Sequence, residues 1–77
     1  MKQHQLSIEA QFRPEILERI LRVIRHRGFR VCTMNVVARA ADNEQVSIDL
    51  TVASQRPIDL LSVQLTKLMD VTRVQVQ

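Results

Sequence analysis

The chain is poor in glycine, cysteine, histidine and aromatic residues: among 77 residues there are one Gly, one Cys, two His and two Phe, with no Trp or Tyr. The single cysteine, Cys32, can form no internal disulfide, and with two histidines it makes no metal-ligand cluster of a recognised spacing. A reducing, cytoplasmic setting fits this composition. We expect Cys32 to be a small buried hydrophobic side chain, and His4 and His26 to lie on the surface.

Long apolar runs are missing as well. The N-terminal MKQHQLSIEA has no apolar core of ~7–15 residues after Lys2, and nowhere do ~18 apolar residues follow one another. We therefore expect neither an export signal nor a membrane partner. Because 45% of the residues are apolar, one globular domain over residues 1–77 is indicated. A chain of this size buries roughly 60% of its unfolded surface, so a partner or self-association would add to its stability.

Positive charge is concentrated in one segment. The net charge is +3, whereas residues 13–30 alone carry a net charge of +4. The arginines of this segment are Arg13, Arg19, Arg22, Arg25, Arg27 and Arg30. Two carboxylates accompany them, and Glu15–Arg19 and Glu18–Arg22 have the spacing of helical ion pairs.

The first part of the chain predicts a strand followed by a helix. Apolar residues alternate with polar ones over residues 5–12, as in a half-buried strand; they are Leu6, Ile8, Ala10 and Phe12. Pro14 suits the first helical position, where its missing N–H would have no partner. Apolar residues at helical spacing follow, and Gly28 is the expected left-handed cap. The helical stripe consists of Leu17, Ile20, Leu21 and Ile24.

Two further strands are expected next. Residues 29–39 are strand-like, but their apolar phase slips, which predicts a bulge near Cys32 and Thr33 and is typical of an edge strand. Asp42 and Asn43 indicate a hairpin turn into a third strand over residues 46–52.

The remaining residues predict a second helix and a fourth strand. Pro57 opens the helix and Asp59 lies in its first turn, where the helix dipole favours a negative charge. The apolar stripe of this helix is Ile58, Leu61, Leu65 and Leu68, and the strand over residues 71–76 places Thr72, Val74 and Val76 on one face.

The halves of the chain repeat one another: Ser7–Glu9 resembles Ser47–Asp49, and Arg13–Pro14 resembles Arg56–Pro57. A β-α-β-β-α-β order with such a repeat predicts an α+β, ferredoxin-like fold. Right-handed crossovers would place both helices on one face of a four-stranded antiparallel sheet.

Catalysis has little support in the sequence. A glycine-rich phosphate loop and a C-x-x-C pair are both missing before the first helix, so we predict no catalytic, metal or cofactor site in this chain. An alternative function is a nucleic-acid-binding module that uses the basic first helix. Base stacking would need exposed aromatics, whereas we expect Phe12 and Phe29 to point inward and Glu9 and Asp49 to lie on the open sheet face.

Four segments carry a family resemblance. They are Pro14, Leu17, Arg19 and Ile20; the run Arg25–Val31 with Met34; Leu50–Ser54; and Leu65–Val71 with Val74. In order and spacing they resemble the ACT-domain small subunits of acetohydroxyacid synthase, also called acetolactate synthase, and above all the short kind that accompanies isozyme II in enteric bacteria.

The resemblance implies a single ACT domain over residues 1–77 that has no active site of its own. It would bind and activate the large catalytic subunit, which holds thiamine diphosphate, FAD and Mg²⁺ and condenses 2-oxoacids in isoleucine, valine and leucine biosynthesis. Longer relatives add a second domain, which we expect this chain to lack.

The resemblance also implies an effector site that has been lost. Valine-sensitive relatives have an N-x-x-G pattern between the first strand and the first helix, and here Phe12 and Glu15 stand at its asparagine and glycine positions. Glu15 would place a negative charge where the carboxylate of valine binds. We therefore expect weak or no valine binding at this vestigial site, which comprises Phe12, Arg13, Pro14 and Glu15.

Two interaction surfaces are predicted. ACT domains commonly pair through the strand after the first helix, which predicts a homodimer through an edge formed by Val31, Thr33, Met34, Asn35 and Val36. The basic face of the first helix is a hypothesis for the surface that meets the large subunit. It comprises Arg13, Arg19, Arg22, Arg25 and Arg30.

Overall fold

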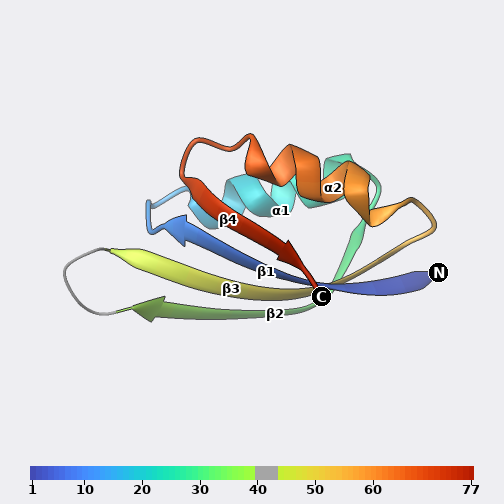
Figure 1. Cartoon of the computed structure of the whole chain (residues 1–77), viewed down its shortest axis with the longest axis horizontal. Helices are drawn as coiled ribbons and strands as arrows, with labels where there is room; N and C mark the ends of the chain where they lie inside the picture. Colours follow the sequence, from blue (N-terminus) through green and yellow to red (C-terminus); the bar gives the residue numbers. More distant parts are fainter. Residues whose placement is uncertain (40–43) are drawn as a thin grey trace.

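The computed structural model describes residues 1–39 and 44–77, with the side chain of Arg39 left out. The elements follow in the predicted order (Figure 1), with bounds β1 Lys2–Gln11, α1 Ile16–His26, β2 Arg30–Arg39, β3 Gln45–Ser54, α2 Ile58–Thr66 and β4 Val71–Val76. The predicted turn at Asp42 and Asn43 lies outside the described residues.

The four strands form one antiparallel sheet in the order β2-β3-β1-β4. Both helices cover the same face of this sheet, and the other face is left open (Figure 1). The predicted ferredoxin-like fold is therefore confirmed. Within the described part of the chain, no helix is long and apolar enough to cross a membrane.

The core lies between the sheet and the helices. Alternate residues of β1 and β3 point into it, as their sequence pattern predicts. The larger side chains that are almost fully buried there are Leu6, Ile8, Ile16, Ile20, Ile24, Ile48, Leu50, Leu61 and Leu65. In α1 the predicted stripe is shifted: Ile16 is buried, whereas Leu17 is only partly buried, because the helix begins at Ile16 and presents residues four apart to the sheet.

The two repeats meet at the centre of the sheet. Ile8 pairs with Ile48, and on either side Ser7 pairs with Asp49 and Glu9 pairs with Ser47. The repeated tripeptides therefore lie opposite each other across β1 and β3. This register relates the two halves of the domain by an approximate two-fold rotation.

Bulges interrupt both edge strands. In β2 the register shifts between Val31 and Thr33, as predicted, and the bulged Cys32 is exposed. The prediction that Cys32 is buried is wrong because the extra residue leaves the regular alternation of the strand. In β4 the register passes from Arg73 to Val71, so that Thr72 is bulged and its hydroxyl donates to the Glu9 carbonyl at 3.0 Å.

The bulge in β4 also changes which residues share a face. Val76, Val74 and Val71 stand opposite Leu6, Ile8 and Ala10, the core-facing residues of β1. Thr72, which the simple alternation placed with Val74 and Val76, is exposed. A two-residue period cannot be carried through a bulge.

Gly28 ends α1 as predicted, with φ at +85°. The residue after it bonds back to the last turn of the helix: the Phe29 N–H donates to the Ile24 carbonyl at 3.0 Å. A side chain on Gly28 would place its Cβ 2.9 Å from Arg56 Nε. The backbone angle therefore favours glycine here, and a side chain would in addition have to displace the Arg56 side chain.

Candidate functional site

The join between β1 and α1 is a short turn at the surface. β1 ends at Gln11, and the Phe12 N–H donates to the Glu44 carbonyl at 2.6 Å. Phe12 is 47% exposed, so its predicted inward orientation is wrong: the chain leaves the sheet before the alternation reaches it. Pro14 and Glu15 form the turn, and the helix begins two residues later than Pro14 predicts.

Glu15 is the N-cap residue of α1, with a φ of −102° that any residue can adopt. Its carboxylate makes no capping hydrogen bond to the amides of the first turn. It lies instead 3.8 Å from Arg19 Nη2, and both side chains are about half exposed. The predicted Glu15–Arg19 pair forms, so the negative charge at the helix start is solvated and partly offset.

Arg13 ties this turn to the far end of the chain. Its Nε lies 3.7 Å from Asp70 Oδ1, and its Nη2 donates to Gln11 Oε1 at 3.0 Å. Asp70 is only 14% exposed, and its carbonyl accepts from the Gln11 N–H at 2.8 Å. Sequence reasoning did not find Asp70 as a partner, because no local signal joins residues so far apart in the chain.

The join between β3 and α2 is built differently. Ser54 is buried, and its hydroxyl donates to the Gly28 carbonyl at 2.9 Å and accepts from the Arg56 N–H at 3.0 Å. A cavity of about 540 Å³ lies beside this join, between the start of β1 and the start of α2. It is lined by Met1, Lys2, His4, Gln55, Arg56, Pro57, Ile58 and Asp59.

The two histidines differ in their surroundings. His26 is exposed, as predicted. His4 is only partly exposed, and its Nε2 is buried with no hydrogen-bond partner in the described part of the chain. The predicted surface position of His4 is therefore wrong for this atom, because residue 4 lies on the core-facing side of β1 with Leu6 and Ile8.

The five arginines of the predicted basic face do not form one continuous surface. Arg13 and Arg19 are engaged with Asp70 and Glu15. Arg25 and Arg30 line a cavity of about 460 Å³ next to β2, together with Leu21, Phe29 and Val31. Arg22 lines a different cleft, of about 240 Å³, between the helices. Among the described residues no ion pair joins Glu18 to Arg22, so that predicted pair is not formed.

The predicted dimer edge lies on an edge strand of the sheet. One side of β2 pairs with β3, and no other strand in residues 1–39 and 44–77 pairs with it. Val31 and Met34 are partly buried, whereas Thr33, Asn35 and Val36 are exposed. The backbone groups on the outer side of β2 are therefore available to another strand.

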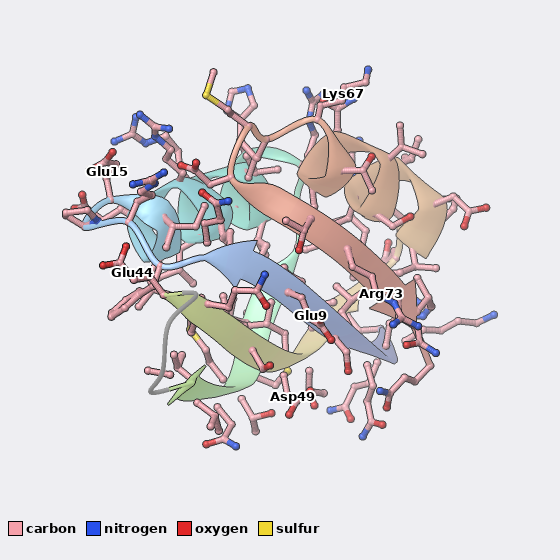
Figure 2. All side chains as sticks on the ribbon, turned by 60° about the vertical axis from the view of Figure 1, so that its left-hand side comes forward. Glu9, Glu15, Glu44, Asp49, Lys67 and Arg73 are labelled. Atoms are coloured by element: carbon pink, nitrogen blue, oxygen red, sulfur yellow. The ribbon has the colours of Figure 1, made fainter. Side chains whose placement is uncertain are left out.

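The open face of the sheet is polar. Glu9, Asp49 and Arg73 lie along the strands (Figure 2), and Asp49 Oδ1 accepts from the Ser7 hydroxyl at 2.9 Å. Phe29 is buried, as predicted, and Phe12 lies beyond the end of β1. The face thus offers carboxylates rather than aromatic platforms, which gives the nucleic-acid alternative little support.

No group of three or more His, Cys, Asp or Glu residues within the described ranges could hold a metal ion. The chemistry that these residues do offer is ion pairing and apolar contact at the surface.

The ACT-domain family model matches residues 12–74. The acetolactate synthase isozyme 2 small subunit of Escherichia coli K12 is 58% identical over 74 residues, which cover 96% of this chain and 84% of that protein. Among solved structures, the acetolactate synthase small subunit of Thermotoga maritima superposes with a TM-score of 0.82 at 18% identity, over 99% of this chain and 47% of that one. The ACT domain of a GTP pyrophosphokinase from Chlorobium tepidum gives a TM-score of 0.76 at 18% identity, over 97% and 96%.

The two structural likenesses establish the fold, and the sequence identity establishes the family within it. The match covers both joins, both helices and all four strands. The chain therefore belongs to the ACT-domain small subunits of acetolactate synthase, of the isozyme 2 type.

Proposed function

We propose that this chain binds the large catalytic subunit of acetolactate synthase and raises its activity in branched-chain amino-acid biosynthesis. The observation that carries the proposal is the 58% identity to the Escherichia coli isozyme 2 small subunit over almost the whole chain. In this proposal thiamine diphosphate, FAD and Mg²⁺ belong to the large subunit. The small subunit contributes contacts that favour the active form of its partner.

Reconstitution tests the proposal. Purified large subunit is assayed for acetolactate formation with increasing amounts of this chain, and we expect the rate to rise and then saturate. A chain unfolded by Ile20→Asp serves as the matched control, because it removes the fold without changing the length. No rise in rate at saturating small subunit would contradict the proposal.

We also propose that valine binds weakly or not at all at the β1–α1 join. Like charges ~4 Å apart repel by about 1–4 kcal/mol, depending on the effective dielectric. Because the Glu15 side chain is 48% exposed and lies close to Arg19, the lower end of this range applies. The charge of Glu15 alone then weakens valine binding about fivefold, and Phe12 removes a polar partner as well.

Titration calorimetry with valine tests this second proposal. We expect no micromolar binding to the wild type and a small gain, about fivefold, for Glu15→Gln. The double substitution Phe12→Asn with Glu15→Gly rebuilds the N-x-x-G pattern and should gain most. Micromolar binding of valine to the wild type would refute the loss of the site.

The homodimer through β2 remains a proposal, supported by the outer side of that strand, which pairs with no other strand in the described part of the chain. Two edge valines of similar exposure allow a matched test, since Val36 on β2 is 37% exposed and Val76 on β4 is 42% exposed. We expect Val36→Glu to shift sedimentation at tens of micromolar toward the monomer, while Val76→Glu leaves it unchanged. A wild type that sediments as a monomer would end the proposal.

A further inference from the structure

The outward side of α2 is apolar. Leu61 and Leu65 are buried against the sheet, whereas Leu60 is 48% exposed and Val63 is 51% exposed. Leu60 and Val63 are three residues apart, so they are neighbours on one face of the helix. A helix that is apolar on several sides is normally covered on more than one of them. The sheet covers one side of α2, and the side with Leu60 and Val63 is left without a cover within the described residues.

A cationic cleft borders this apolar side. The cleft between the helices is lined by Arg22, Val23 and His26 of α1, by Arg27 directly after it, and by Gln64 of α2. Arg27 Nη2 donates to Gln64 Oε1 at 3.0 Å, which fixes the two helices at this point. Because Gln64 follows Val63 directly and lies one turn after Leu60, the cleft and the apolar side of α2 are contiguous.

Lys67 adds a further positive charge one turn after Val63, where its side chain extends away from the sheet (Figure 2). We name the combined area the helix-pair surface; it comprises Leu60, Val63, Lys67, Arg22, His26 and Arg27. The area contains no carboxylate, although Glu18 and Asp59 flank it one turn before Arg22 and Val63. Its character is an apolar centre with cations along its edges.

Charge decides which partner this surface fits. A second copy of the chain would bring the same cations to the same place, and like charges facing each other across an interface are unfavourable. The surface is instead complementary to an apolar segment rimmed by carboxylates. We propose that the helix-pair surface docks such an acidic, apolar-centred segment of the large catalytic subunit, an inference that rests on the function proposed above.

This surface differs from the predicted basic face. Arg22 is the only residue common to both sets, since Arg13 and Arg19 are engaged in ion pairs and Arg25 and Arg30 line the cavity beside β2. It also differs from the β2 edge. A dimer through β2 and a docked large subunit can therefore exist together.

Two pairs of matched variants test the docking surface. Val63→Glu is compared with Val76→Glu on β4, because these valines are 51% and 42% exposed and Val76 lies outside both proposed interfaces. Arg22→Glu is compared with Arg73→Glu, because both arginines are exposed and Arg73 lies on the open sheet face. The dissociation constant for the purified large subunit is measured by titration at two salt concentrations, and circular dichroism monitors the fold.

We expect Val63→Glu, at the apolar centre, to raise the dissociation constant about tenfold or more, as a substitution near the centre of an interface does. Arg22→Glu reverses a charge at the edge and should raise it by about fivefold. The two control variants should change it by about twofold or less. Higher salt should weaken the wild type but affect Arg22→Glu less, because one screened charge pair has been removed.

The inference is overturned if Val63→Glu and Arg22→Glu bind as the wild type does, or if the controls weaken binding equally. In both cases the wild type still binds and activates, so the proposed function stands. A wild type that fails to bind the large subunit overturns the proposed function and this inference with it.

Discussion

The two halves of the domain share a core and differ at their outer surfaces. At the centre Ile8 pairs with Ile48, and each half buries its helix on the same sheet face. Away from the centre, α1 presents arginines whereas α2 presents Leu60 and Val63. The join before α1 has two ion pairs whose arginines are about half exposed, and the join before α2 has the buried hydroxyl of Ser54. The repeat is thus kept where packing requires it and is lost on the outer surfaces.

The shared core gives the largest expected effects. Ile20 of α1 and Leu61 of α2 are fully buried, so Ile20→Ala and Leu61→Ala should each lower the free energy of unfolding by about 2–5 kcal/mol. Leu60→Ala, on the exposed side of α2, should cost about 0.5 kcal/mol or less. Urea unfolding measures all three. If one of these two core substitutions lowered the free energy of unfolding much less than the other, the two helices would not contribute equally to the core.

The helix ends give the next effect. Gly28 ends α1 at a φ of +85° with Arg56 close by, whereas α2 ends at Lys67 with a φ of −82°. Gly28→Ala should cost about 1–2 kcal/mol of unfolding free energy, and Lys67→Ala close to none. In an Arg56→Ala background the contact with Cβ is relieved, so the remaining loss measures the backbone angle alone. Equal stability of Gly28→Ala and the wild type would contradict the left-handed cap.

Substitutions at the two joins should also differ in their cost in unfolding free energy, by about as much as those at the two helix ends. Ser54→Ala removes the bonds to the Gly28 carbonyl and the Arg56 N–H, which should cost about 1–2 kcal/mol. Gln11→Ala, at the corresponding place before α1, removes an exposed side chain and should cost about 0.5 kcal/mol or less. Thermal unfolding of both variants compares the joins directly. The contrast fails if Gln11→Ala is the more damaging change.

The ion pair of the first join gives the smallest effect. Asp70→Asn removes the charge opposite Arg13. The Asp70 side chain is 14% exposed, but that of Arg13 is 51% exposed and the two charged atoms lie 3.7 Å apart, so the substitution should cost about 1 kcal/mol or less. The loss should shrink further at high salt, because the Arg13 side of the pair is open to solvent and is screened. Stability measured at low and high salt checks this. A loss as large as that of Ser54→Ala would show that the first join depends on this pair as much as the second depends on its hydroxyl.

The sequence predicts the fold well because the central strands alternate without interruption. Leu6 and Ile8 on β1, and Ile48 and Leu50 on β3, are buried as their period requires. Gly28 is predicted because only one backbone conformation explains a lone glycine after a helical stripe. The bulge at Cys32 is predicted from the slipped phase of its neighbours.

Other features could not be predicted from local pattern. Phe12 continues the alternation of β1 in sequence, but the chain leaves the sheet before this residue. Thr72 is displaced by a bulge in β4 that no residue type in the segment predicts. The partnership of Arg13 with Asp70 depends on how the α2–β4 turn meets the β1–α1 turn. At the candidate site the sequence identified the arginines, but their division among separate clefts follows from the packing of α1 against α2 and β2.

Cys32 has a practical consequence, since it is the one thiol of the chain and lies exposed at the bulge of β2. A fluorescent or spin label attached there needs no engineered attachment point and sits on the strand where two copies are proposed to meet. Label mobility and label-to-label distance would then report strand pairing directly, while the helix-pair surface, where the large subunit is proposed to dock, remains unlabelled.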